Sequence, residues 1–190
     1  AAALEKINSL NVSGLTRDTP LRIDSAYARQ TNVFKDPSSA SGLPSVGHYI
    51  KKILLVSDND AYNRLYEFVG QRTLNETLHK KGYQDVRIIH RLSVGDGEER
   101  ARYTNPITFY DGDRIVYQQP LVYNPNVYPN KLKTTSMGVG YYQNGRLVQQ
   151  PMDFSDKNFL TIATQQAILK SLIFPEAVPA QQRFNLTEED

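Results

Sequence analysis

The sequence predicts an α+β fold, a mixed α/β chain in which helices come first, β-hairpins follow and a single helix comes last. Three observations support this order. Apolar residues recur at helical spacing in several runs before residue 82. Two later stretches, ITFYDGDRIVYQQP and GVGYYQNGRLVQQP, place β-branched and aromatic residues around Asp-Gly or Asn-Gly, which are strong hairpin signals. A last apolar run, from about residue 156 to residue 173, is again helical.

Each helix of the first half is marked by an apolar face, and most also have a residue suited to cap the first turn. Ser45 is suited to cap one helix, and Asp58 or Asn59 is suited to cap the next. Gly70 is expected to end that helix in a left-handed conformation, because glycine carries no Cβ that would clash there. The four expected helices cover residues 1–10, 46–56, 61–69 and 73–81.

The remaining segments are predicted to be loops and β-structure. The polar, turn-rich stretch from about residue 11 to residue 44 contains one short expected strand, at 20–23. Asp111-Gly112 and Asn144-Gly145 mark two hairpins, because Gly and Asn tolerate the positive φ angles of tight turns. The hairpins resemble each other in sequence, since each ends in Gln-Gln-Pro, but nothing else repeats.

Both ends of the chain have the sequence of interrupted elements. No capping Ser, Thr or Asp precedes the opening helix AAALEKINSL. The terminal NLTEED is typical of a first helical turn, with Asn185 or Thr187 as its cap. The last complete helix is expected to begin at Ser155 or Asp156 and to end before Pro175. We therefore expect residues 1–190 to form one domain that is truncated at both ends.

Composition excludes several classes of partner and site. The net charge of +2 is small and the basic residues are scattered, so neither nucleic acid nor an anionic membrane is implied. The absence of cysteine excludes disulfides, thiol catalysis and thiolate metal sites. His48, His79 and His90 form no zinc-binding pattern, so neither a metal nor a cofactor is expected. No apolar run approaches the ~20 residues that a membrane-spanning helix needs.

The triplet Ser57-Asp58-Asn59 carries the strongest functional signal. Helix capping accounts for it in structural terms, since all three residue types cap helices well. Its context is more specific, because it follows the run ILLV and leads into NDAYNRLYEFVGQRTLNETLHKKGY. This arrangement resembles the serine β-lactamases and penicillin-binding transpeptidases, which carry an S-D-N motif between two helices. The resemblance covers residues 1–94 and 158–179, whereas region 105–151 looks like an inserted, hairpin-rich segment.

The resemblance implies a role for each residue of the triplet. Ser57 would relay a proton between the lysine of the family's S-x-x-K motif and the leaving nitrogen of the substrate. Asn59 would direct its side-chain amide at the acyl-amide group of a bound substrate. Asp58 would face inward and hold the loop by hydrogen bonds, which is a structural role.

Two further signatures of the family have no match in the chain. No Ser-x-x-Lys is present, and the order of the family's motifs places the nucleophile before Ala1. The nearest stretch to K-T-G is 133–136, Lys-Thr-Thr-Ser, in which Thr135 replaces the glycine. That stretch also precedes the last helix, where the family has K-T-G after it. The strand that carries K-T-G is therefore expected beyond Asp190.

The base that deacylates the intermediate is not identified by its usual motif. In class A β-lactamases this glutamate lies in an R-x-E-P-x-L-N loop, at about the position of HRLSVGDGEERARYTNP here. Arg91 fits the start of that loop, but no Glu-Pro pair follows. Glu98 and Glu99 are the carboxylate candidates, although neighbouring Glu and Arg residues commonly form a solvated face.

The expected function is acyl-serine chemistry on small-molecule β-lactams or cell-wall-type peptides, outside the cytoplasm, with this chain inactive on its own. The alternative is a non-catalytic binding or scaffold domain of the same fold that uses its Tyr-rich hairpins. Tyr117, Tyr123 and Tyr128 would then either wall a cleft or pack against the body. An unrelated α+β domain would instead place Ser57 and Asn59 on a convex face. The substrate, the oligomeric state and the choice between hydrolysis and transpeptidation stay open.

Overall fold

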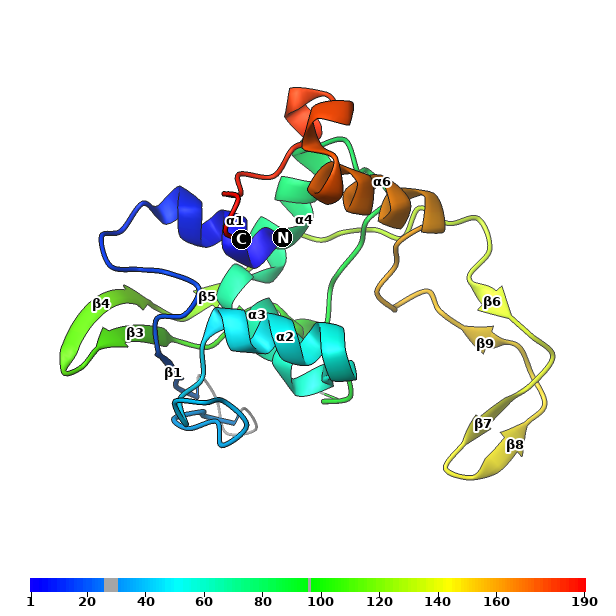
Figure 1. Cartoon of the computed structure of the whole chain (residues 1–190). Helices are drawn as coiled ribbons and strands as arrows, with labels where there is room; N and C mark the ends of the chain where they lie inside the picture. The colour runs from blue at the N-terminus through cyan, green and yellow to red at the C-terminus, as the bar shows by residue number, and fades with distance from the viewer. Residues whose placement is uncertain (26–30, 96) are drawn as a thin grey trace.

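The computed structural model describes residues 1–25, 31–95 and 97–190, with the side chain of Glu98 also outside the description. A helical body carries a small antiparallel sheet on one side and a long β arm on the other (Figure 1). Helices and strands both contribute, in the order helices, hairpins, helix, which confirms the predicted α+β class.

Four helices form the centre of the body, and α3 packs against the other three. Ser45 caps the second helix and Asp58 caps the third, as the sequence predicts. Gly70 has the expected positive φ of 85°, but its ψ of 140° is extended, so the chain turns directly into the next helix. That helix consequently begins two residues earlier than predicted. The four are α1 (Ala2–Leu10), α2 (Val46–Val56), α3 (Asn59–Val69) and α4 (Gln71–Lys80).

A three-stranded antiparallel sheet in the order β1-β3-β4 covers one side of these helices (Figure 1). β1 (Leu21–Ile23) lies within the predicted short strand, and β3 (Ile107–Asp111) with β4 (Arg114–Gln119) forms the first predicted hairpin. Apolar residues of β3 face α3, where the Phe68 and Phe109 rings meet edge to face with centroids 5.3 Å apart. The first hairpin is therefore part of the main core.

A short segment links the helices to this sheet. It contains α5 (Gly97–Ala101) and β2 (Tyr103–Thr104), and β2 pairs with β5 (Val122–Tyr123) after the first hairpin. The rest of the Pro-, Asn- and Tyr-rich stretch that follows is irregular, as predicted.

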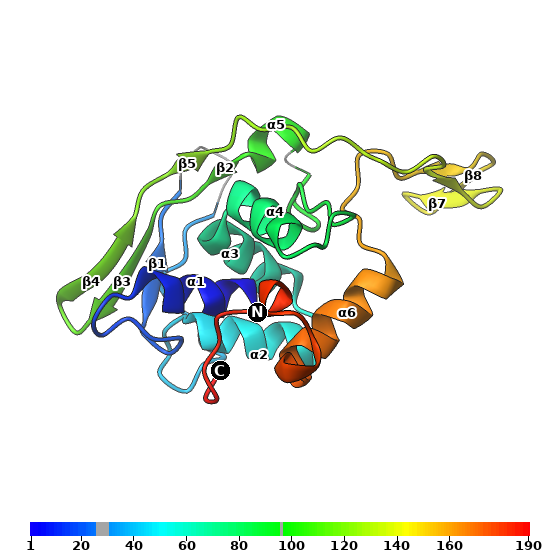
Figure 2. The ribbon, with the colours of Figure 1, turned by 90° about the horizontal axis from the view of Figure 1, so that it is seen from above.

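The second hairpin lies on an arm that extends away from the body (Figure 2). Two separate two-stranded ladders form it. The inner ladder pairs β6 (Ser136–Met137) with β9 (Met152–Asp153). The outer ladder pairs β7 (Tyr141–Gln143) with β8 (Arg146–Val148) around the predicted Asn144-Gly145 turn.

The C-terminal part differs from the sequence prediction at two places. α6 (Ile162–Ile173) is capped by Thr161 and so begins later than predicted from Ser155 or Asp156, because residues 155 and 156 form a turn and Phe159 pairs with Arg87. No helix begins at Asn185 or Thr187 in the described C-terminal segment, where the Thr187 hydroxyl instead donates to Asp190. Two single-turn helices, η1 (Pro175–Ala177) and η2 (Ala180–Gln182), connect α6 to this end.

Candidate functional site

Ser57 lies at the sharp turn between α2 and α3. Its backbone is left-handed, with φ 54° and ψ 43°, and its N–H donates to the carbonyl oxygen of Ile53 at 3.1 Å. A non-glycine residue in this conformation is uncommon and is held by its surroundings. The Ser57 side chain is exposed, and no hydrogen bond reaches its hydroxyl among the described residues. The turn therefore presents a free hydroxyl at the surface.

Asp58 fixes the start of α3 beside this hydroxyl. Its Oδ1 accepts a hydrogen bond from the Ala61 N–H at 2.9 Å, and its Oδ2 lies 3.2 Å from Lys52 Nζ. The hydrogen bond from Ala61 and the charge of Lys52 lower the pKa of this carboxyl group. The carboxylate thus satisfies an otherwise unpaired donor of the first helical turn. This geometry supports the structural role predicted for Asp58.

Asn59 connects the turn to a distant segment of the chain. Its Nδ2 donates to Ser93 Oγ at 3.3 Å, and Ser93 also has a left-handed backbone, with φ 57°. Ser57 and Asn59 are both exposed. The two predicted catalytic residues therefore lie together at one turn, and Ser93 joins them without having been predicted.

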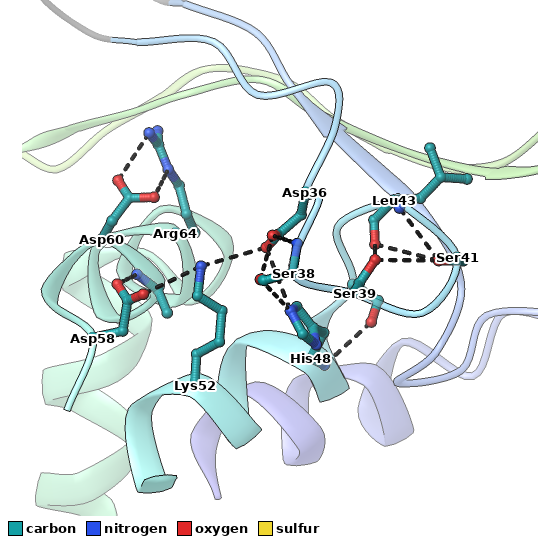
Figure 3. A network of polar contacts seen from close by, with 12 residues as sticks. Asp36, Ser38, Ser39, Ser41, Leu43, His48, Lys52, Asp58, Asp60 and Arg64 are labelled. Carbon is teal, nitrogen blue, oxygen red and sulfur yellow. Dashed lines mark hydrogen bonds and ion pairs between the residues drawn. The ribbon is translucent and has the colours of Figure 1, made fainter. Parts of the chain in front are cut away.

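A polar network holds the turn from the side of α2 (Figure 3). Lys52 Nζ lies between Asp36 Oδ2 at 3.5 Å and Asp58 Oδ2 at 3.2 Å. Burial by itself raises the pKa of Asp36, but hydrogen bonds from Ser38 and the charges of Lys52 and His48 lower it below its ordinary value. Lys52 therefore links the loop before α2 to the turn after it.

Ser38, His48 and Asp36 have the residue types of a catalytic triad, but their hydrogen bonds are arranged differently (Figure 3). The Ser38 hydroxyl donates to Asp36 Oδ1 at 2.5 Å, so its oxygen accepts from His48 Nε2 at 2.9 Å. His48 then presents a protonated nitrogen to the serine and cannot take its proton. This cluster orders the loop and does not activate a nucleophile.

The segment that carries Ser93 is fixed by side-chain amides from the helices. Asn63 donates from Nδ2 to the Leu92 carbonyl at 2.9 Å and accepts from the Leu92 N–H at 2.7 Å. Asn75 bonds both backbone groups of Ile88 in the same way, at 2.6 and 2.9 Å. Gln71 adds a bond to the Ile89 carbonyl at 2.7 Å. These three amides satisfy backbone groups of Ile88, Ile89 and Leu92, as a neighbouring strand would.

A hollow of about 410 Å³ borders Ser93. Its wall includes His90, whose Nε2 accepts from the Asn158 N–H at 3.2 Å while its Nδ1 donates to the Arg91 carbonyl at 2.6 Å. Both ring nitrogens are engaged in hydrogen bonds with the backbone, so His90 offers neither nitrogen to the hollow. The volume lies within the range of small-molecule sites. The lining residues are Ile89, His90, Arg91, Ser93, Gly95, Gly97, Asp156 and Lys157.

Comparison with known families assigns the chain. The model of the Beta-lactamase enzyme family matches residues 2–125, more than half of the 190-residue sequence. This chain belongs to the beta-lactamase enzyme family. No curated protein and no solved structure matches it. The family match includes the Ser57-Asp58-Asn59 turn and the β3–β4 hairpin, and it ends before the arm.

In this beta-lactamase family member, the Arg91 side chain is buried. Its guanidinium pairs with the Glu67 carboxylate, with both side chains at most 3% exposed, and it also donates to the Tyr103 carbonyl. Glu67 accepts the Asn105 N–H as well. Burial raises the pKa of Glu67 despite the nearby Arg91 charge. The pair fastens α3 to the segments on either side of α5, and Glu67 is a residue that sequence reasoning did not identify.

The two carboxylate candidates lie on α5. Glu99 is exposed and accepts a hydrogen bond from the Tyr123 hydroxyl at 3.2 Å, and its other oxygen is 3.5 Å from Arg102 Nε. The structure thus places Glu99 against the β5 strand. The Glu98 side chain lies outside the described part of the chain. Both remain predictions as family bases.

The other residues singled out in this family member are distributed away from the turn. Tyr117 packs on Phe109, and Tyr123 stacks on Tyr103 with ring centroids 4.6 Å apart. Tyr128 lies beside His79, with centroids 6.2 Å apart. The three tyrosines therefore do not form one aromatic wall. Stretch 133–136 lies at the base of the arm, where the Thr135 hydroxyl donates to Asp153 at 2.9 Å.

Proposed function

We propose that this chain provides the Ser-Asp-Asn side of an acyl-serine site that acts on β-lactams or cell-wall-type peptides. The observation that carries the proposal is the shared turn of Ser57 and Asn59, exposed and joined to Ser93 at the edge of the 410 Å³ hollow. The family match supports the hydrolase fold. The nucleophilic serine, its lysine and the K-T-G strand would come from polypeptide outside residues 1–190, and the isolated chain would be inactive.

The proposed chemistry uses each residue of the turn differently. The serine oxygen adds to the substrate carbonyl, the carbonyl carbon–nitrogen bond breaks, and an acyl ester with the serine forms. The free Ser57 hydroxyl passes a proton to the departing nitrogen and receives one from the lysine side. Asn59, oriented by Ser93, holds the acyl-amide group of the substrate. Asp58 takes no part in proton transfer, because its oxygens are engaged by Ala61 and Lys52.

The proposed cellular location depends on the proposed substrates. No helix among the described residues is long and apolar enough to cross a membrane. Cell-wall-type substrates would place the protein outside the cytoplasm. Residues 1–190 would form one domain. Of the hairpin-rich region 105–151 that the sequence suggested as an insertion, the first hairpin lies in the main core and within the family match, so the arm is the part proposed as inserted.

Labelling with a fluorescent penicillin tests this function. In the full-length protein that contains this chain, we expect a covalent adduct, and Ser57→Ala to slow its formation by about 100-fold or more. Ser136→Ala, an exposed serine of the arm, is the matched control and should label normally. Normal labelling of Ser57→Ala would reject the proton relay. An adduct or turnover on residues 1–190 alone would reject the proposed incompleteness.

The arm favours one alternative, a binding or scaffold domain of the same fold. Its apolar and aromatic side chains are uncovered, with Val139 92% and Tyr142 77% exposed. A protein of this kind would bind peptide or glycan through the arm and would lack acylation. Replacing the arm with a short Gly-Ser linker distinguishes the two functions, because acylation should survive in the enzyme and ligand binding should disappear in the binder.

A further inference from the structure

Lys52 bridges two carboxylates that lie on either side of α2. Its ammonium group lies 3.5 Å from Asp36 in the loop before α2 and 3.2 Å from Asp58 in the turn after it. Asp36 and Asp58 are far apart in sequence, and α2 lies between them. Figure 3 shows the Lys52 side chain pointing away from α2, with its ammonium group between the two carboxylates.

The contacts of the bridge are partly shielded from water. The side chains of Asp36, Lys52 and Asp58 are 9%, 21% and 23% exposed. Exposed ion pairs contribute little to stability, but partial burial and a shared partner strengthen the mutual attraction of these charges. The Asp36 carboxylate is in turn fixed by the Ser38 N–H and hydroxyl. The loop therefore offers Lys52 a rigid anchor.

At the other end of the bridge, Lys52 contacts the Ser57–Asn59 turn through Asp58. Ser57 has a left-handed backbone, and its hydroxyl has no partner among the described residues that could hold the turn itself. The Asp58 carboxylate caps α3 through the Ala61 N–H. A shift of Asp58 would therefore move the first turn of α3, which carries Asn59.

We propose that Lys52 is a positioning residue for the acyl-serine site, holding the Ser57–Asn59 turn by bridging Asp36 and Asp58. The inference rests on the proposed function for its effect on acylation, but the structural coupling stands without it. Lys52 touches no substrate and transfers no proton. Removing it would leave the fold in place and loosen the geometry in which Ser57 and Asn59 act.

Amide hydrogen exchange in the full-length protein tests the coupling between Lys52 and the turn without an activity assay. Lys52→Met should speed exchange of the Ala61 amide, which the Asp58 carboxylate protects, by about fivefold or more, because local opening becomes easier. Lys52→Arg should restore protection. Lys51→Met is the matched control, because Lys51 is the exposed neighbour on α2 and makes no ion pair or hydrogen bond with the described side chains. Unchanged Ala61 exchange in Lys52→Met would overturn the proposal.

A double-mutant cycle identifies the anchor. Asp36→Asn should raise Ala61 exchange less than Lys52→Met does, and the double variant should exchange no faster than Lys52→Met alone. Independent, additive effects would show that Asp36 does not act through Lys52. They would reduce the bridge to a simple Lys52–Asp58 pair and overturn the proposal as stated.

Acylation kinetics separates positioning from general stabilisation. In the full-length protein, Lys52→Met should lower the acylation rate constant about tenfold with little change in the concentration for half-saturation, and Lys51→Met should change neither. Faster Ala61 exchange with an unchanged acylation rate would overturn the positioning role while leaving the proposed function intact. Absence of any adduct in wild type would reject the proposed function and the positioning role with it, whereas the exchange result would still decide the coupling.

Discussion

The two hairpins have similar sequences, but one is part of the core and the other lies on the exposed arm. β3–β4 and β7–β8 each pair around a glycine turn. The sequence Gln-Gln-Pro overlaps the end of β4 and directly follows β8. In the first, Ile107 and Phe109 are fully buried against β1 and α3. In the second, Tyr142 is 77% exposed and Leu147 is 54% exposed. The local sequence forms the hairpin, whereas a third strand and a helix face decide whether it belongs to the core.

The difference follows from strand length and from the partners available. β3 and β4 have five and six residues and meet β1, whereas β7 and β8 have three residues each and belong to a two-stranded ladder. A two-stranded hairpin alone is only marginally stable in water. We therefore expect the body to unfold as one cooperative unit and the arm to lose its structure independently of the body.

The largest expected contrast comes from removing one aromatic ring from each hairpin. Phe109→Ala should lower the free energy of unfolding by about 3–5 kcal/mol, since it leaves a cavity beside Phe68. Tyr142→Ala should change it by less than about 0.5 kcal/mol, because the ring is exposed. Urea unfolding followed by circular dichroism measures both. Equal losses would show that the arm and the body form one cooperative unit.

A smaller contrast is expected at the two turns. Gly112 and Gly145 have φ values of 60° and 76°, and an alanine in this region costs about 1–2 kcal/mol. Gly112→Ala should therefore lower the global unfolding free energy by this amount. Gly145→Ala should leave global unfolding unchanged and weaken the cross-strand nuclear Overhauser effects between β7 and β8. Asp113→Ala, which lies outside the positive-φ positions, is the control and should alter neither.

The smallest expected difference between body and arm concerns how stability changes with acid pH. Asp36 and Asp58 in the body have lowered pKa values, and so does Asp153 in the arm through hydrogen bonds from Ser155 and Thr135. A lowered folded pKa gives stability that is present above about pH 4, the unfolded value, and is lost as pH falls through the folded value. Asp58→Asn should therefore flatten the acid dependence of global unfolding. Asp153→Asn should not, and a similar flattening by both would contradict the separation.

Local signals predicted most of the secondary structure. Ser45 and Asp58 cap the helices that the sequence assigned to them, and Asn144-Gly145 forms the predicted turn. The predicted start of α6 was wrong because the Asn158 side chain bonds to a distant segment of the chain. Its Oδ1 accepts from the Ile89 and His90 N–H groups, which holds Asn158 against that segment and outside the helix. No capping pattern reveals such a long-range bond.

The site was predictable only where its residues are neighbours in sequence. Ser57, Asp58 and Asn59 came from one motif, but their partners Lys52, Asp36 and Ser93 are brought together by folding. Arg91 matched a loop motif, yet its burial with Glu67 depends on a contact across 24 positions. An acidic residue in an amphipathic helix carries no sign of such a partner.

The side-chain amides of Asn63, Gln71 and Asn75 hold residues 88–92 by hydrogen bonds to the backbone and not to the side chains of that segment. These bonds do not depend on the side chains of Ile88, Ile89 and Leu92, since any L-residue offers the same N–H and carbonyl groups. Two other side chains bond to α3 here, because Arg91 pairs with Glu67 and Ser93 accepts from Asn59. The helices therefore determine both where the wall of the hollow lies and how its polar side chains are oriented.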